Sequence, residues 1–274
     1  MTIAAAVRIM GILNVTPDSF SDGGNFSSRR SAVKQAGLLI EAGADIIDIG
    51  GESTRPYAEP VDTEDECARV IPVISAIRSF SDIPISIDTT KAEVARRALA
   101  AGATIINDVS ALRNDPEMTE VVKDSGGEVI IMHMKGTPGT MQDDPYYENV
   151  IEEIISFFKE RLAAIAADGV ALEKVTIDPG IGFGKKLEHN LAILKHLESF
   201  SVLNRPLLLG HSRKRFLGDI TGLDAADRDM VSAVVSGLCL DQNVSIFRVH
   251  DVASTKYALQ VSRAIKQTAD PTFS

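Results

Sequence analysis

Residues 10–24 read Met-Gly-Ile-Leu-Asn-Val-Thr-Pro-Asp-Ser-Phe-Ser-Asp-Gly-Gly, an apolar run that passes directly into polar, glycine-rich sequence. The run from Ile9 to Leu13 is typical of a buried parallel strand, and it ends at Asn14. Proline and glycine then interrupt regular structure, yet Phe20 supplies an apolar ring that a fully solvated loop does not need. We therefore expect a buried strand followed by a loop that closes over a ligand.

The same combination of an apolar strand and a polar end recurs along the chain, with helical patterns in between. Further strands are predicted at residues 44–49, 83–87, 104–106, 128–132, 175–177, 207–209 and 245–249. Helices are predicted at residues 31–42, 63–77, 91–101, 116–124, 147–167 and 253–266. Strand and helix alternate in units of roughly 30 residues, a pattern typical of parallel βα units. Eight such units form a closed barrel of about 250 residues, so we predict a single-domain (β/α)8 TIM barrel. A doubly wound open sheet is the alternative.

Polar side chains stand at or just after the carboxyl ends of the predicted strands. They are Asn14, Arg55, Asp88, Asn107, His133, Asp178, Lys214 and His250. In a closed parallel barrel these positions surround one mouth, where barrel enzymes carry their active sites. This arrangement favours the barrel over the open sheet and predicts a single active site.

The composition is that of an ordinary globular protein. Of 274 residues, 45% are hydrophobic and 24% charged, and no linker divides them, so we expect one domain over residues 1–274. No apolar run approaches the roughly 18 residues of a membrane span, and the formal net charge of -10 argues against non-specific nucleic-acid binding. Cys67 and Cys239 are far apart, which indicates reduced structural thiols. We expect a cytoplasmic protein without membrane or nucleic-acid partners.

Two carboxylates, Asp88 and Asp178, are attached directly to apolar strand ends. Either one alone could cap the following helix. Both on one rim, with Asn107 between them, favour a ligand instead. Two carboxylates and an amide match the donors and acceptors of an aminopyrimidine ring, because a carboxylate accepts two parallel N–H bonds. The sequence therefore predicts a pocket for a heterocycle.

Cations cluster after the seventh and eighth predicted strands. Residues 212–215 read Ser-Arg-Lys-Arg, and Arg248 and His250 follow the last strand. A basic run usually forms a solvated face, but this one lies on the predicted rim after Gly210, and Arg55 is expected on the same rim. Because arginine forks suit phosphate oxygens, we predict a phosphate or diphosphate site.

The glycine-rich segment 180–185 lacks the spacing of nucleotide-binding loops. We expect its glycines to let a ring lie against the backbone, with Phe183 as a wall. His189 and His196 are seven residues apart without acidic partners three or four residues away, which makes a poor metal site. His133 is either a general base or a hydrogen-bonded rim residue, and the sequence leaves both open.

Several of these stretches, in order, match one known family. They are residues 10–24, 50–56, 86–89, 105–108, 132–134, 178–184, 212–214 and 248–252. On these motifs the chain resembles the dihydropteroate synthases along nearly its whole length. The resemblance implies a transferase of folate biosynthesis that condenses 4-aminobenzoate with (7,8-dihydropterin-6-yl)methyl diphosphate, giving 7,8-dihydropteroate and diphosphate. It also implies a Mg²⁺ cofactor and a homodimer formed through the late helices.

The resemblance implies a part for individual residues of this chain. The implied pterin-binding residues are Asp88, Asn107, Met132, Asp178, Phe183 and Lys214. The implied diphosphate ligands are Asn14, Arg55, Arg248 and His250, with Asn14 also a ligand to Mg²⁺. The implied 4-aminobenzoate residues are Phe20, Thr54, Pro56 and Arg215. Asp22, Arg55, Lys214, Arg248 and His250 form the implied catalytic group, in which Asp22 lies beside the reacting carbon.

Two positions depart from the common family pattern. Tyr57 stands where many members have glycine, and Arg215 stands where some have a serine that contacts the 4-aminobenzoate carboxylate. Arg215 either takes over that contact or points to solvent, and Tyr57 stiffens or reshapes its loop. Sulfonamides mimic 4-aminobenzoate, so both positions bear on whether the protein is a sulfonamide target or is resistant.

The implied reaction has a physical course. An electron-rich dihydropterin delocalises positive charge at its exocyclic methylene, so diphosphate departure runs ahead of amine attack and the substitution is SN1-like. Two other functions remain as alternatives. A methyltetrahydrofolate corrinoid methyltransferase shares the strand-end carboxylates but uses no diphosphate, and an inactive paralogue binds pterin without turnover. The predicted anion site argues against the first, and the presence of every expected reacting-site residue argues against the second.

Overall fold

The described residues form a closed barrel of eight parallel strands, in the order β1 to β8. The computed structural model describes residues 7–16, 24–53, 60–137, 139, 141 and 144–268, with the backbone alone for residues 24–28. The strands are β1 (Arg8–Asn14), β2 (Ile46–Gly50), β3 (Ile85–Asp88), β4 (Ile105–Asp108), β5 (Glu128–Met132), β6 (Val175–Asp178), β7 (Leu207–Leu209) and β8 (Val244–Val249). β8 pairs with β1 and closes the circle. The predicted barrel is confirmed, and the open sheet is excluded.

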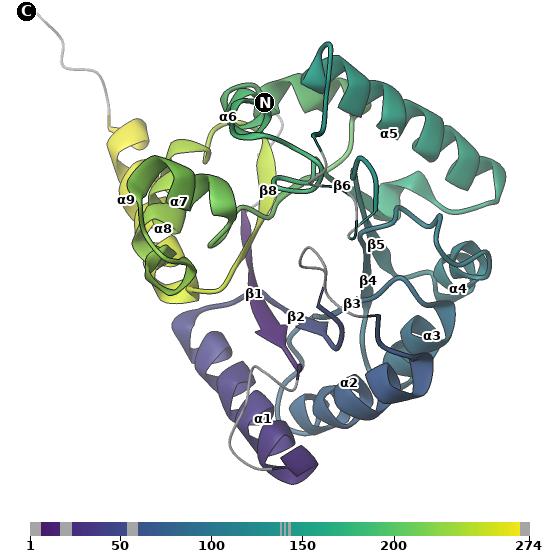
Figure 1. Cartoon of the computed structure of the whole chain (residues 1–274). Coiled ribbons are helices and arrows are strands. Elements are labelled where there is room, and N and C mark those ends of the chain that lie inside the picture. Colours follow the sequence, from purple (N-terminus) through teal and green to yellow (C-terminus); the bar gives the residue numbers. More distant parts are fainter. Residues whose placement is uncertain are drawn as a thin grey trace, which may run out of the picture.

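Helices surround the strands on the outside (Figure 1). They are α1 (Gly24–Ala42), α2 (Thr63–Arg78), α3 (Ala92–Ala100), α4 (Met118–Ser125), α5 (Val150–Ala167), α6 (Leu187–Lys195), α7 (Arg215–Thr221), α8 (Asp229–Leu238) and α9 (Val252–Gln267), with short 3-10 turns at Leu172–Lys174, Leu197–Leu203 and Ala225–Asp227. The helices predicted from the sequence do not include α6, α7 or α8. Each is short, and Gly218 and Gly237 are typical of breaks.

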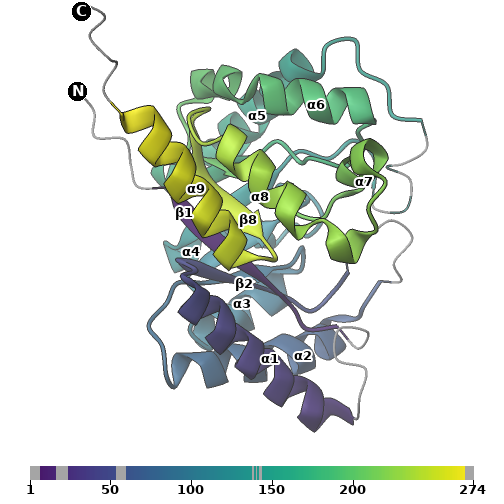
Figure 2. The same cartoon turned by 90° about the vertical axis from the view of Figure 1, so that its left-hand side faces the viewer.

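α8 and α9 pack side by side on one flank of the barrel (Figure 2). Gly237 permits this close approach, because a Cβ at that position would lie 2.8 Å from Ser262 Oγ of α9. The two predicted structural thiols, Cys67 and Cys239, are buried and free of disulfides. In the part of the chain that the structure describes, no helix is long and apolar enough to span a membrane.

The barrel interior changes from apolar to polar along the strands. One closed cluster fills its lower part: Met10, Ile46, Ile105, Ile130, Leu208 and Ile246. Side chains alternate along a strand, so the next inward positions come two residues later. On β2, β4 and β8 those positions are Asp48, Asn107 and Arg248. The apolar floor thus supports a polar layer at the carboxyl ends of the strands.

An ion-pair cluster ties the carboxyl end of β2 to two neighbouring helices. Lys91, the residue before α3, lies 2.6 Å from Glu66 Oε2 of α2 and also contacts the Glu52 carboxylate. The Glu66 side chain is completely buried. Glu52 Oε1 accepts a hydrogen bond from the backbone N–H of Val61 at 3.2 Å, so this carboxylate joins chain segments on both sides of residues 54–59.

We expect Lys91→Met to destabilise the fold by about 3–5 kcal/mol, because it leaves the buried carboxylate of Glu66 without its cation. The double variant Lys91→Met with Glu66→Leu removes both charges and should recover most of the loss. Urea denaturation followed by circular dichroism measures both. A double variant no more stable than the single one would show that charge compensation is not what Lys91 provides.

Candidate active site

The structure brings predicted rim residues together at the carboxyl ends of the strands. Asp88 ends β3, Asn107 lies in β4, Asp178 ends β6, Lys214 precedes α7, and Arg248 lies in β8. Asn107 and Asp178 are buried. Residues from across the chain therefore converge on one interior site, as the sequence predicts.

The Arg248 guanidinium is held between two carboxylates. Its Nε donates to Asp48 Oδ2 at 2.6 Å, and its Nη2 donates to Asp88 Oδ2 at 2.6 Å. Burial lowers the pKa of Arg248, but attraction by Asp48 and Asp88 outweighs it and raises the pKa above its ordinary value. Arg248 is therefore a fixed positive charge that links β8 to β2 and β3.

Asp48 is a site residue that the sequence analysis missed. It lies within β2 and is completely buried, and both its oxygens lie 3.4 Å from Asn107 Nδ2. The strand around it reads Ile-Ile-Asp-Ile-Gly, so its signal was a charged residue inside an otherwise apolar run. Charged residues are almost never fully buried unless they are paired. An aspartate inside an apolar strand, with no partner evident nearby in the sequence, is thus the pattern that would have identified Asp48 as a site residue.

Asp178 and Lys214 form the opposite side of the site. Asp178 Oδ1 accepts a hydrogen bond from the Gly180 N–H at 2.8 Å, and burial raises the pKa of Asp178 while the charge of Lys214 acts to lower it. Burial lowers the pKa of Lys214 to about 8, against the attraction of Asp178. Lys214 also donates to the Ile181 carbonyl. At neutral pH this side of the site presents a cation that can lose its proton unusually easily.

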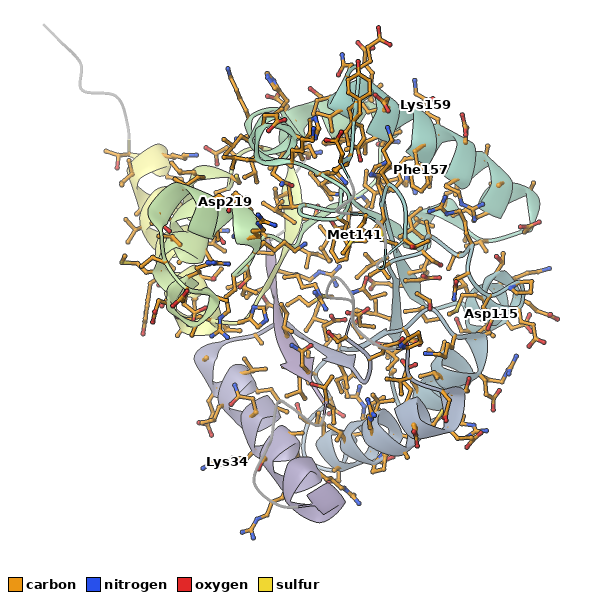
Figure 3. The ribbon with its side chains drawn as sticks, viewed as in Figure 1. Lys34, Asp115, Met141, Phe157, Lys159 and Asp219 are labelled. Atoms are coloured by element: carbon orange, nitrogen blue, oxygen red, sulfur yellow. The ribbon has the colours of Figure 1, made fainter. Side chains whose placement is uncertain are left out.

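Apolar side chains line the same side. The Lys214 ammonium lies 4.4 Å from the centre of the Phe183 ring. Phe183 packs against a buried group made of Val109, Met132, Met134 and Met141. In Figure 3, Met141 is seen near the barrel axis, while Lys34, Lys159 and Asp219 lie at the periphery. Met132 and Phe183 are therefore placed where walls of a ring pocket are expected.

The glycine-rich segment allows the close packing of this wall. Gly180 has φ +70, and a Cβ there would lie 2.0 Å from the His133 carbonyl oxygen. Gly182 has φ +81, and a Cβ there would lie 3.2 Å from Lys214 Cδ. Only glycine fits such positions readily. The close approach that these contacts show is between parts of the chain, and the approach of a ligand ring stays a prediction.

His133 is a buried, hydrogen-bonded residue. Its Nδ1 lies 3.0 Å from Lys185 Nζ, which also donates to the Phe183 carbonyl at 3.0 Å. Burial, with the charge of Lys185, lowers the pKa of His133 to about 2. A base this weak removes protons poorly at neutral pH. Of the two alternatives left open by the sequence, the geometry favours the hydrogen-bonded residue.

The cation run at residues 213–215 divides in three directions. Arg213 turns outward and pairs with both carboxylate oxygens of Asp229 in α8, at 2.6 Å each. Arg215 has an exposed side chain, with its Nε 3.6 Å from Asp219 Oδ1. Only Lys214 of the three enters the buried site, so the prediction that the whole run forms the anion site is corrected here. The place of Arg215 in a 4-aminobenzoate site stays a prediction.

His250 is joined to the same loop through Ser212. Ser212 Oγ lies 2.9 Å from His250 Nδ1 and accepts a hydrogen bond from the His250 backbone N–H at 3.1 Å. Ser212 is buried. The loops after β7 and β8 are therefore linked by one hydroxyl group, which orients the imidazole.

Asn14 is the residue that the family resemblance implies as the protein ligand to Mg²⁺, and it lies in the described part of the chain. It ends β1 opposite Gly50, and a Cβ on Gly50 would lie 3.9 Å from Asn14 Oδ1 and 3.8 Å from Asp88 Oδ2. Within the described ranges, no group of three or more His, Cys, Asp or Glu side chains is arranged to hold a metal ion. Amide and carboxylate oxygens suit Mg²⁺, which commonly takes one or two protein ligands together with substrate phosphates. The residues present fit that mode of binding.

The remaining site residues lie outside the described parts of the chain. They are Phe20, Asp22, Thr54, Arg55, Pro56 and Tyr57. Their assigned functions remain predictions from the family resemblance.

The chain is similar in sequence and in structure to known proteins. Residues 10–250 match the family described as "Pterin binding enzyme". The dihydropteroate synthase of Escherichia coli (strain K12) is 46% identical over 257 residues, covering 94% of this chain and 91% of that protein. Xanthomonas albilineans dihydropteroate synthase with 4-aminobenzoic acid has a TM-score of 0.90 and 44% identity, covering 96% of this chain and 94% of that one. A structure of the same enzyme in complex with 7,8-dihydropteroate has a TM-score of 0.88 and 41% identity, covering 98% and 97%.

The pKa of Asp88 predicts how stability depends on pH. Burial raises this pKa from 3.8 to about 7; Arg248 acts to lower it, and Asp48 raises it further. The folded state therefore holds a proton that the unfolded chain releases near 3.8, and the associated stability is lost as the pH rises through about 7. Relative to Asp88→Asn, the wild-type protein should lose roughly 3 kcal/mol of unfolding free energy between pH 5 and pH 8. Urea denaturation of both proteins across this range tests it, and a constant difference would contradict it.

Proposed function

Since the chain belongs to the dihydropteroate synthase family of pterin-binding enzymes, we propose that it condenses 4-aminobenzoate with (7,8-dihydropterin-6-yl)methyl diphosphate. The products are 7,8-dihydropteroate and diphosphate, in folate biosynthesis. The observation that carries the proposal is a single interior site in which two carboxylates, Asp88 and Asp178, lie with two cations, Arg248 and Lys214. Carboxylates suit the N–H groups of a pterin, and cations suit its diphosphate.

The pterin ring is held by Asp88, Asn107, Asp178 and Lys214, between the apolar walls of Met132 and Phe183. Asp178 is anchored by the Gly180 N–H, so its second oxygen remains for the ring. Burial raises the pKa of Asp178, and the charge of Lys214 acts against this shift, in favour of the ionised form that accepts N–H bonds. A buried charged hydrogen bond of this kind contributes roughly 1.5–3 kcal/mol.

The diphosphate is held by Arg55, Arg248 and His250, with Asn14 as the protein ligand to Mg²⁺. Bound Mg²⁺ would neutralise negative charge that gathers on the leaving group. Arg248 adds a positive charge whose direction is fixed by Asp48 and Asp88. Such preorganised charges stabilise the transition state without moving during the reaction.

Substitution at the methylene carbon is SN1-like. The C–O bond to diphosphate breaks ahead of attack, its electron pair leaves with the diphosphate, and the dihydropterin delocalises the positive charge. Asp22 offsets this charge, and the loops that carry Phe20, Thr54 and Pro56 build the 4-aminobenzoate site and exclude water. The lone pair of the arylamine nitrogen forms the new C–N bond, and the resulting ammonium releases one proton to solvent. The arylamine is nucleophilic when neutral and needs no strong base, which agrees with the low pKa of His133.

The test is diphosphate release by the purified protein, given the dihydropterin diphosphate and Mg²⁺, with and without 4-aminobenzoate. Release and dihydropteroate formation that depend on 4-aminobenzoate support the synthase. Pterin binding without turnover would favour an inactive paralogue, and methyl transfer from methyltetrahydrofolate to a corrinoid would favour the methyltransferase. Titration with a sulfonamide in the same assay, with Tyr57→Gly and Arg215→Ser as comparison variants, measures how those positions affect drug sensitivity.

Substitution of Asp178 should mainly affect pterin affinity, and substitution of Asp22 should mainly affect kcat. Asp178→Asn should weaken pterin binding roughly 10- to 100-fold, because it loses a charged hydrogen bond. Asp22→Ala should lower kcat by roughly 100-fold while pterin affinity stays near that of the wild type, because its charge matters only as the cation forms. Calorimetric titration with 6-hydroxymethylpterin and steady-state kinetics separate the two. Unchanged pterin affinity in Asp178→Asn, or unchanged kcat in Asp22→Ala, would remove the corresponding assignment.

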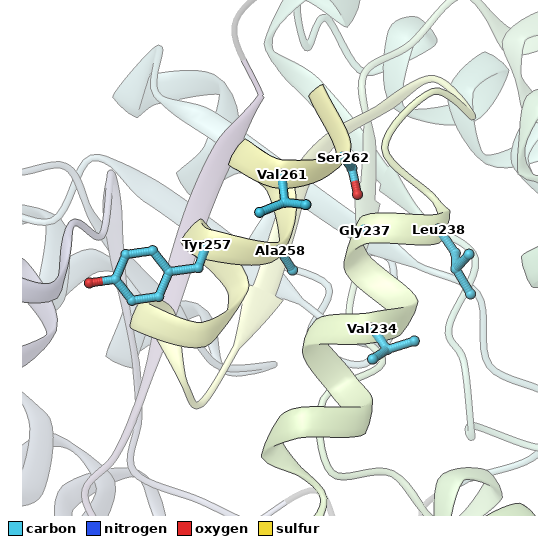
Figure 4. A pocket seen from close by; sticks show the side chains of 7 residues that line it. All are labelled: Val234, Gly237, Leu238, Tyr257, Ala258, Val261 and Ser262. Atoms are coloured by element: carbon cyan, nitrogen blue, oxygen red, sulfur yellow. The ribbon is translucent and has the colours of Figure 1, made fainter. Parts of the chain in front are cut away.

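We also propose that the protein forms a homodimer through the outer face of α8 and α9. Exposed apolar residues repeat on this face at helical spacing: Met230, Val234 and Leu238 on α8, and Tyr257, Val261 and Ile265 on α9. Figure 4 shows the shallow pocket between the two helices, lined by Val234, Gly237, Leu238, Tyr257, Ala258, Val261 and Ser262. Exposed apolar side chains gathered on two adjacent helices mark an interaction surface, and a second copy presents the same surface.

The dimer proposal predicts that Leu238→Glu combined with Val261→Glu gives a monomer, because buried like charges would face each other across the symmetric interface. Sedimentation velocity at micromolar concentration measures the change in mass. Leu191→Glu is a matched control, since Leu191 is an exposed leucine on α6, away from this face. A wild-type protein that sediments as a monomer would refute the proposed interface.

A further inference from the structure

We propose that Asp48 is a positioning residue of the reaction, which fixes the guanidinium of Arg248 for contact with the diphosphate. This inference rests on the proposed function. Asp48 does not itself touch the substrate. It acts through Arg248, and it belongs to the layer just above the apolar floor of the barrel.

The geometry of Arg248 requires two anchors. Asp48 Oδ2 accepts from Nε and Asp88 Oδ2 accepts from Nη2, each at 2.6 Å. Two carboxylates on different nitrogens fix the direction and the plane of the planar guanidinium. The two described hydrogen bonds use Nε and Nη2, which leaves the edge of the guanidinium that carries Nη1 to meet an anion.

The two anchors are not equivalent. Asp88 ends its strand, with 11% of its side chain exposed, and it is also assigned to the pterin ring. Asp48 lies within β2, with none of its side chain exposed. Its other described contact is a long one, 3.4 Å to Asn107 Nδ2. When the ring engages Asp88, Asp48 is therefore the anchor that continues to hold Arg248.

The Asp48 side chain is enclosed by the apolar floor, Arg248 and Asn107. Ile46, two residues earlier on the same face of β2, belongs to the apolar floor. A buried carboxylate without a cation is strongly unfavourable, so Asp48 and Arg248 stabilise each other as charges. Asn107 Nδ2 contacts both oxygens of Asp48, so the same carboxylate also orients an amide assigned to the ring. Asp48 thus links the diphosphate side of the site to the pterin side.

The first test is the kinetics of Asp48→Asn, which keeps the shape and one acceptor oxygen but removes the charge. We expect kcat/KM for the dihydropterin diphosphate to fall roughly 10- to 100-fold, because a misplaced binding group costs about that much, while KM for 4-aminobenzoate stays unchanged. Asp45→Asn is the matched control. Asp45 also flanks β2, but it accepts from the Ile9 N–H at 2.7 Å, well before the carboxyl end of the strand. Kinetics of Asp48→Asn equal to those of Asp45→Asn would overturn the proposal.

Adding Asp48→Asn to Arg248→Met tests whether Asp48 acts through Arg248, and this comparison remains usable if Asp48→Asn alone does not fold. Arg248→Met is compared with Arg248→Met combined with Asp48→Asn, in which both charges of the pair are gone. If Asp48 acts through Arg248, the second change costs no further activity; where Asp48→Asn also folds, its single effect completes the cycle and the two effects are non-additive. A further tenfold loss on adding Asp48→Asn would overturn the proposal.

The outcomes for Asp48 and for the proposed function are distinguishable. Absence of turnover by the wild-type protein would reject the synthase proposal whatever the variants do. Calorimetric titration with inorganic pyrophosphate then tests Asp48 by itself. At least tenfold weaker binding to Asp48→Asn than to the wild-type protein supports the positioning of Arg248, and equal binding overturns it.

Discussion

The interior of this barrel is organised around one buried positive charge. Arg248 reaches from β8 to carboxylates on β2 and β3, at 2.6 Å each, and thereby crosses the line where the first and last strands meet. A guanidinium is poorly tolerated in a dry interior unless carboxylates surround it. The positions of Asp48 and Asp88 are therefore linked to that of Arg248. Burial raises the pKa of Asp88 and Arg248 acts to lower it, so the ionisation of this site residue depends on the same pair.

The barrel divides its interior between stability and chemistry. Six large apolar side chains close its lower part. Burial of these side chains stabilises the fold and requires no hydrogen-bond partners. Charged groups can therefore occupy the layer above them. The same side-chain alternation that places Ile46 and Ile105 in the floor places Asp48 and Asn107 two residues later. Stability and reactivity are thus separated by position along the same strands.

The sequence predicted the barrel and the polar rim because both follow from local patterns. Asp88, Asp178 and Asn107 could be recognised because each lies near the end of an apolar strand, and such ends meet in a parallel barrel. The direction of a side chain depends on distant partners and was not predictable in this way. Arg213 has φ 57 and pairs with Asp229 sixteen residues later, and this partner turns it away from the site that Lys214 enters. Asp48 was missed because its partner, Arg248, is two hundred residues away in the chain.

The helix α8 has two faces with different neighbours. On its inner side, the Ser232 carbonyl lies 2.8 Å from His211 Nε2, Ser232 Oγ accepts from the Arg213 N–H at 3.0 Å, and Asp229 pairs with Arg213. These contacts hold residues 211–213, which lead directly into Lys214. On its outer side, the same helix exposes Met230, Val234 and Leu238 to the surroundings. A partner that binds this outer face and displaces α8 therefore also displaces residues 211–213 and, with them, Lys214. The outer surface of α8 is thus coupled through the helix to the interior site.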